Sequence, residues 1–223
     1  MKQQRLEQLA DGIFSIVLTL LVLEIRVPEL PTYASNLELL FSLKPLIPLF
    51  LSYILSFTLL FSYWRSHHFI MSVFAHNVDH RLVNINAIFF LLIAIVPFTS
   101  HFLGAYSTYY VAIWIFALQF MLIGLVLLWM RSYAEKSNTI VNSPYTPIEK
   151  RHAYMRMIFP MLCALVAIVF AFINSKLALT LFTIGIIFNL SKRSTHLMSR
   201  MIGIVLPSWR ETKQDAHTVT HHG

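Results

Sequence analysis

The sequence has 223 residues, of which 57% are hydrophobic and only 12% are charged, and its mean hydropathy is +0.66. Because so few polar residues could not cover the surface of a soluble domain, this composition excludes that class and predicts an integral membrane protein. The net charge of +7 does not require a nucleic-acid partner, since membrane proteins gather Lys and Arg in their cytoplasmic loops.

The first predicted helix, residues 5–26, is apolar but carries a line of polar side chains. At about 1.5 Å per residue it reaches roughly 33 Å, enough to cross the hydrocarbon core of a bilayer. Asp11, Ser15 and Thr19 follow one another at four-residue steps on one side. An ionisable residue inside a membrane helix costs about 2.5 to 3.5 kcal/mol and usually faces protein or water. We therefore place this helix at the centre of the assembly.

Five more helices are predicted along the chain. Residues 27–45 are broken by Pro28, Pro31 and Pro45 and form a loop with room for a short surface helix. The helices that follow are expected at 46–64, 82–103, 109–130, 147–173 and 176–190. The helix expected at 147–173 has the start signal Thr146-Pro147-x-Glu149. Arg65, His67 and His68 mark a membrane boundary after the helix expected at 46–64. The fold is thus all-α, with a six-helix membrane domain at 1–190 and a basic cytoplasmic tail at 191–223.

An even number of spans puts both termini on the same side of the membrane. Fourteen of the seventeen Lys and Arg residues then lie on that side, against Arg26, Lys44 and Lys176 on the other. This bias predicts that both termini are cytoplasmic. The basic tail could contact anionic lipid headgroups, and the bias accounts for the positive charge without nucleic acid.

The first helix has two faces, and each allows two interpretations. The polar line borders an aqueous path or packs against other helices; for Asp11 we favour packing, with Arg5, His67 or His68 as its partner. On the other side, Ile16, Leu20 and Leu23 form an apolar stripe. Such a stripe usually packs, but around an axis shared by several copies it would form hydrophobic rings that gate a pore by dewetting. Periodicity alone does not choose between them.

Several motifs resemble the transmembrane protein 175 potassium-channel family. The first helix reads Arg5-x-x-x-Leu9-Ala10-Asp11, then Gly-Ile-Phe-Ser-Ile at 12–16 and Thr-Leu-Leu-Val-Leu-Glu-Ile at 19–25. Trp64-x-x-His67-His68, Asn86 and Pro97-Phe98 are similar to the family's second and third helices. The family signature has Phe and Ser where this chain has Leu9 and Ala10, which removes a hydroxyl beside Asp11.

The resemblance implies a prokaryotic, tetrameric, potassium-selective cation channel in the plasma membrane, with the first helix at its centre and no cofactor besides permeant potassium and other monovalent cations. It implies a pore lined by Ile16, Thr19, Leu20 and Leu23, with the constriction at Ile16 or Leu23. The motif residues it carries over are Arg5, Asp11, Ser15, Trp64, His67, His68 and Asn86. No Thr-Val-Gly-Tyr-Gly segment occurs, so a carbonyl filter is not expected. Hydrophobic rings would instead select modestly, since potassium holds its hydration shell less tightly than sodium.

Three other functions are weighed against a channel. His67, His68, His76, Asp79 and His80 include metal-binding residue types, but without a standard ligand spacing we expect no metal site. No motif of a membrane enzyme is present. A proton- or ion-coupled transporter using Asp11 with His67 or His68 is the main alternative, although the chain shows no internal repeat.

Overall fold

The computed structural model describes residues 3–29, 35–74, 78–136 and 147–190, and every regular element in these ranges is a helix. The elements are α1 (Gln3–Leu23), α2 (Asn36–Ser42), the 3₁₀ turn η1 (Lys44–Leu46), α3 (Ile47–Phe74), α4 (His80–Ala94), α5 (Val96–Ala105), α6 (Tyr110–Lys136), α7 (Pro147–Ala171) and α8 (Ser175–Leu190). The all-α prediction is confirmed. The predicted tail at 191–223 and the cap Thr146 lie outside the described residues.

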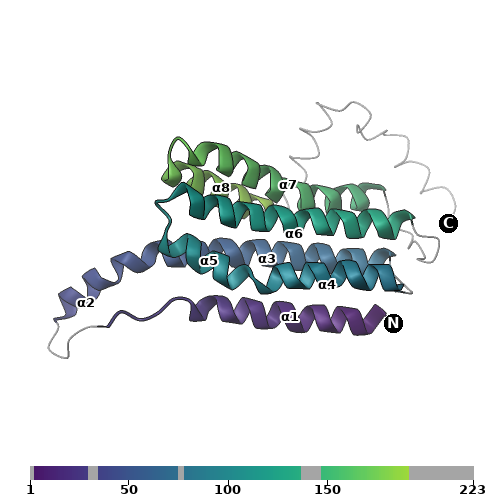
Figure 1. Cartoon of the computed structure of the whole chain (residues 1–223), viewed down its shortest axis with the longest axis horizontal. Coiled ribbons are helices and arrows are strands. Elements are labelled where there is room, and N and C mark those ends of the chain that lie inside the picture. Colours follow the sequence, from purple (N-terminus) through teal and green to yellow (C-terminus); the bar gives the residue numbers. More distant parts are fainter. Residues whose placement is uncertain (1–2, 30–34, 75–77, 137–146, 191–223) are drawn as a thin grey trace, which may run out of the picture.

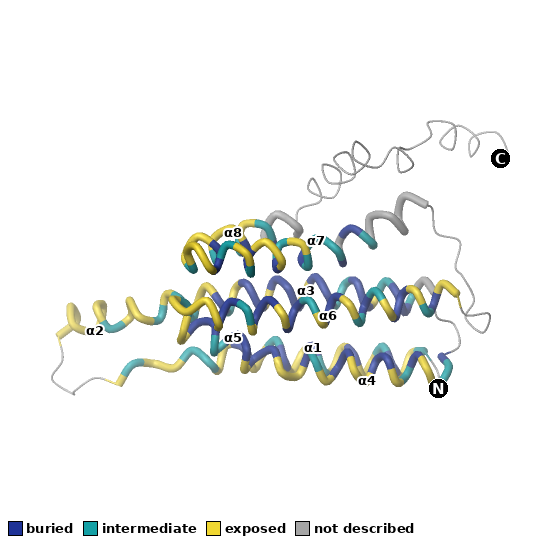
Figure 2. The backbone as a smooth tube through the Cα atoms, turned by 45° about the horizontal axis from the view of Figure 1, so that its top comes forward, coloured by how far each residue is buried: buried dark blue, intermediate teal, exposed yellow. Residues whose placement is uncertain are grey.

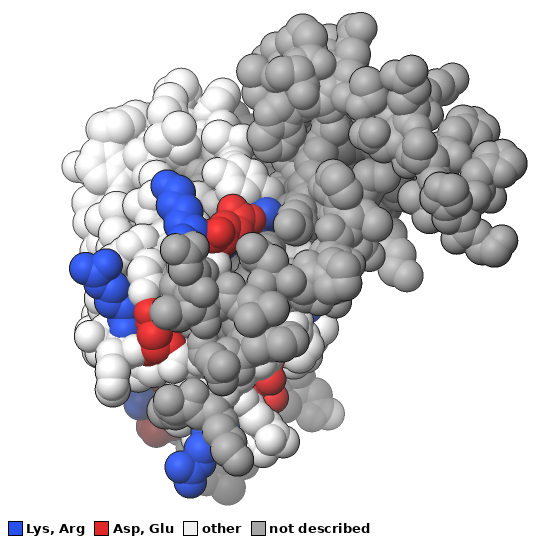
Figure 3. Space-filling view, turned by 90° about the vertical axis from the view of Figure 1, so that its right-hand side faces the viewer, with Lys and Arg blue, Asp and Glu red and all other residues white. Residues whose placement is uncertain are grey.

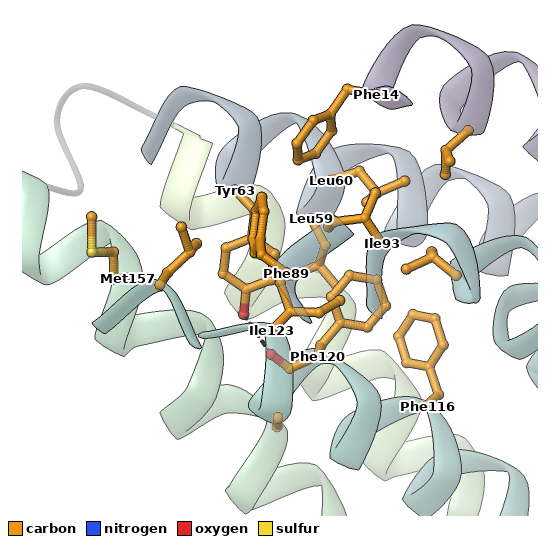
Figure 4. Close-up of a cluster of buried hydrophobic side chains, with 14 of the residues drawn as sticks. Phe14, Leu59, Leu60, Tyr63, Phe89, Ile93, Phe116, Phe120, Ile123 and Met157 are labelled. Carbon is orange, nitrogen blue, oxygen red and sulfur yellow. Dashed lines mark hydrogen bonds between the residues drawn. The ribbon is translucent and has the colours of Figure 1, made fainter. Parts of the chain in front are cut away.

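The long helices lie side by side in layers (Figure 1). α1 forms one edge, α3 packs with α5 in the middle with α4 alongside, and α6 with α7 and α8 forms the other edge. Figure 4 shows the core between them, where Phe14 of α1 meets Phe89 of α4, and Tyr63 of α3 donates a hydrogen bond to the Phe120 carbonyl of α6 at 2.9 Å. Within the single chain, α1 is therefore an edge helix and not a central one.

Four helical stretches are long and apolar enough to cross a membrane: Gln3–Leu23, Asn36–Ser72, His80–Ala105 and Tyr110–Lys136. They correspond to the first four predicted spans. The described apolar parts of α7 and α8, Met157–Ala171 and Ser175–Ile186, are shorter. Six spans therefore remain a prediction.

The second predicted helix, 46–64, is longer in the structure. α3 continues to Phe74 and holds Arg65, His67 and His68 inside the helix instead of at its end. Before it, α2 starts at a capping box, in which the Ser35 hydroxyl and the Glu38 carboxylate each accept from the other residue's backbone N–H. α2 buries no residue and extends from the bundle (Figure 2).

The third predicted helix, 82–103, is divided into α4 and α5 at Ile95. Pro97 explains the break, because it has no N–H to donate to the carbonyl of Ile93 and its ring crowds the preceding turn. The Gln119 side chain of α6 donates to the nearby Leu92 carbonyl at 2.6 Å. A side chain from a neighbouring helix thus supplies a donor where the backbone ladder is interrupted.

Charged side chains gather at the end of the bundle shown in Figure 3. This end holds the start of α1 and the last turn of α3, where the Gln3 amide donates to the Met71 carbonyl at 2.9 Å. It also holds the start of α4 and the end of α6, where the Asp79 carboxylate accepts a hydrogen bond from the Tyr133 hydroxyl. The opposite end carries the turns that follow α1 and α5.

Candidate functional site

The buried face of α1 follows a helical period. Leu6, Ala10, Phe14, Val17 and Leu21 are each at most 4% exposed, and steps of three and four residues place them on one side of a helix. This side packs against α3, α4 and α5. Ala10, where the family signature has Ser, is therefore a buried methyl group in this contact, and Leu9 beside it is 49% exposed.

The opposite face of α1 has no cover within the described part of the chain. Ile16 is 60% exposed, Leu20 42% and Leu23 68%, and Thr19 is also exposed. Figure 2 shows exposed and buried positions alternating along α1. The apolar residues alone could face lipid. Asp11 and Ser15 are exposed as well, and groups of this kind are unfavourable in contact with acyl chains.

The hydroxyl of Thr19 is satisfied within its own helix. It donates to the Ile16 carbonyl at 2.8 Å and lies 3.1 Å from the Ser15 carbonyl. A hydroxyl has one proton and two acceptor lone pairs. Its oxygen therefore keeps acceptor capacity on the open face of α1.

The partner of Asp11 is an indole and not a cation. Trp64 Nε1 of α3 donates to Asp11 Oδ1 at 2.8 Å, and the Trp64 ring stacks on His68 at 6.0 Å between centroids. The predicted partners Arg5, His67 and His68 do not pair with Asp11, and Arg5 is exposed without a hydrogen bond or ion pair in the described ranges. Arg5 and Asp11 are six positions apart, which places them on different sides of a helix with 3.6 residues per turn.

His67 and Asn86 form a buried polar contact between α3 and α4. His67 Nε2 lies 2.7 Å from Asn86 Oδ1, and Asn86 Nδ2 donates to the Leu82 carbonyl at 2.8 Å. Because the amide nitrogen faces a carbonyl, the amide oxygen is the acceptor and His67 Nε2 carries the proton. The imidazole also stacks on Phe89, with centroids 5.1 Å apart and planes 4° from parallel.

The histidines near this end do not form a metal centre in the described ranges. His67 is engaged by Asn86, and Asp79 accepts from the backbone N–H of Leu82 as the cap of α4. No group of three His, Cys, Asp or Glu residues there could hold a metal ion. His76, the remaining member of the predicted cluster, lies outside the described residues.

We expect Asn86→Leu to lower the free energy of unfolding by about 1 to 2 kcal/mol, because it leaves the buried Nε2–H of His67 without an acceptor. Thermal unfolding in detergent measures this. Asn84→Leu is the matched control, since Asn84 is exposed on the same helix. Equal melting temperatures for the two variants would contradict the assignment of a stabilising pair.

A second contact ties the far end of α1 to α5, and sequence reasoning missed it. His101 Nδ1 lies 3.4 Å from Glu24 Oε2 and 3.3 Å from the Glu24 carbonyl oxygen. The two residues are 77 positions apart, so no local periodicity could have paired them. The presence of Glu24 directly after the apolar stripe is the only sequence signal.

Comparison with known proteins shows which family this part of the chain resembles. Residues 5–97 match the family model described as the endosomal/lysosomal potassium channel TMEM175. This stretch contains nearly all of α1 and its Asp11–Trp64 contact with α3, together with α4 and its Asn86. This part of the chain is similar to the TMEM175 family. The family's description is that of a channel and not of an enzyme.

Relatives support the same assignment. The chain is 37% identical over 102 residues to a potassium channel of Chamaesiphon minutus and 34% identical over 105 residues to one of a Chryseobacterium species. These alignments cover 46% and 47% of this chain, and they span about half the length of the relatives, 49% and 50%.

A solved structure extends the likeness beyond the matched half. The crystal structure of a lysosomal potassium-selective channel TMEM175 homolog from Chamaesiphon minutus superposes with a TM-score of 0.70 and 28% sequence identity. The match covers 86% of this chain and 97% of that chain. The TMEM175 fold therefore includes the helices that follow the break at Pro97.

Proposed function

We propose that the chain is one subunit of a potassium-permeable cation channel and that copies of α1 line its ion path. The observation that carries this proposal is the uncovered face of α1, which combines exposed apolar residues with Asp11, Ser15 and Thr19. The similarity to proteins named potassium channels supports it.

The uncovered face needs cover from more than one chain. A carboxylate and two hydroxyls would face lipid if the subunit stood alone in a membrane. Several copies arranged around an axis, with α1 innermost, turn this face toward one another and toward a narrow water path. We propose a homotetramer, as the family resemblance implies. An edge helix in the subunit thereby becomes the central helix of the assembly.

The apolar residues of this face set the constriction in our proposal. Ile16, Leu20 and Leu23 from each copy would form stacked rings around the axis, with the constriction at Ile16 or Leu23 and Thr19 between them. Rings of this kind resist wetting and can close a pore without a moving lid. An ion crosses them partly dehydrated, which favours potassium modestly over sodium because its hydration shell is held less tightly.

The polar contacts of α1 and α3 act as positioning devices. The Asp11–Trp64 bond fixes the rotation of α1, and the buried His67–Asn86 pair fixes α3 against α4. In our proposal Arg5, Ser15 and His68 belong to the same region at the base of α1. We place both termini and the basic tail, 191–223, on the cytoplasmic side of a prokaryotic plasma membrane, following the bias of Lys and Arg.

A coupled transporter using Asp11 with His67 or His68 is the alternative. It needs a proton or ion to pass between these groups. In the described residues, Asp11 accepts a hydrogen bond from Trp64, and the Trp64 ring stacks on His68. His67 is hydrogen-bonded to Asn86. No direct bond joins Asp11 to either histidine, which favours the channel.

Single-channel recording of the purified protein in planar bilayers tests the proposal. Under a gradient of potassium against sodium, we expect discrete current steps with a reversal potential displaced toward that of potassium. A carrier turns over too slowly to produce such steps. Well-folded protein that gives a silent bilayer but moves protons in a flux assay would replace the channel with the transporter.

A further inference from the structure

The end of α1 opposite the N-terminus carries an unexplained pair of side chains. α1 ends at Leu23, and the next residue, Glu24, faces His101 of α5 across 3.4 Å. The two side chains remain 37% and 40% exposed. A glutamate in contact with water is negatively charged at neutral pH, and the last carbonyls of α1 add a partial negative charge at the same place.

The other charged groups at this end do not pair with His101. The other charged residues are Arg26 and Glu29 after α1, Glu38 in α2, Lys44 in η1 and Lys176 in α8. The titratable phenols at this end are those of Tyr106, Tyr109 and Tyr110, in and beside the turn after α5. Within the described ranges, Glu24 is the one carboxylate at ion-pair distance from His101.

We infer that Glu24, held beside His101, concentrates cations at this mouth of the channel. The inference rests on the proposed function, because it requires copies of α1 around an axis. Glu24 then repeats once per subunit directly beyond Leu23, the last residue of the apolar stripe. Carboxylates around a narrow opening raise the local cation concentration and so the rate of entry.

The test is the unitary potassium conductance of the purified chain in zwitterionic bilayers, measured for wild type, Glu24→Gln and Glu24→Asp. At about 0.01 M salt we expect Glu24→Gln to lower the conductance about two-fold or more, and at about 1 M salt we expect no difference, because the Debye length falls from about 30 Å to about 3 Å. Glu24→Asp keeps the charge and should conduct as wild type does, which separates charge from folding.

A further variant sharpens the result. Lys176→Gln removes a charge at the same end on α8, away from α1 in Figure 1, and should leave the conductance unchanged.

Three outcomes would overturn the inference. Equal conductance of wild type and Glu24→Gln at low salt would overturn it and leave the channel proposal standing. A change confined to open probability would make the pair a mechanical tie between α1 and α5. A wild-type protein that gives no current steps would overturn the channel proposal and, with it, this inference.

Discussion

Ile16→Asn is expected to raise the potassium current through the channel about tenfold at a fixed voltage, the factor that corresponds to a barrier lowered by about 1.4 kcal/mol. The amide side chain would hold water at a ring that otherwise resists wetting. Ile16 is 60% exposed and belongs to no core contact of the subunit, so the change should leave the subunit fold intact. Macroscopic current per reconstituted channel measures the effect.

Matched variants locate the effect on α1. Leu23→Ala shortens the side chain of another proposed ring and should also raise the current. Leu118→Asn introduces the same amide at a position of α6 that is 54% exposed and should not. If the Ile16→Asn channel carried the wild-type current, the narrowest ring would not be at Ile16. If Leu23→Ala also left the current unchanged, α1 would not form the constriction.

Gly104→Ala is expected to lower the free energy of unfolding by about 1 to 3 kcal/mol, the range for overpacked cores. A β-carbon at Gly104 would lie 2.8 Å from Leu49 Cα, 2.7 Å from Ser52 Oγ and 2.6 Å from Leu49 Cδ2. Backbone atoms cannot rotate away, so α5 would have to move from α3. The same crossing holds the buried bond from Ser56 Oγ to Ser100 Oγ, at 2.8 Å, which the movement would stretch.

The melting temperature in detergent measures the change at Gly104. Gly12→Ala provides the control, because a β-carbon at Gly12 meets no atom within 4 Å in the subunit, and alanine favours a helix. We expect the control to melt at or above the wild-type temperature. If Gly104→Ala also melted at or above the wild-type temperature, the close crossing of α3 and α5 would not be what holds these helices together.

The helices could be predicted from the sequence because apolar runs and prolines are local signals. The predicted first helix, 5–26, and fourth helix, 109–130, correspond to Gln3–Leu23 and Tyr110–Lys136. α7 begins at Pro147, where the start signal places it. The second predicted helix, 46–64, continues to Phe74 in the structure, past the polar residues Arg65, His67 and His68, and His67 is buried in contact with Asn86 of α4.

The sequence by itself determined the membrane class, the helical fold and the motifs of α1 that lead to the family, since each depends on residues within a few turns of one another. Only the tertiary structure decided which partner each polar group has. Trp64 and not a cation binds Asp11, Asn86 binds His67, and His101 binds Glu24. These choices depend on how helices distant in the chain are rotated and packed, and a local pattern carries no information about that rotation.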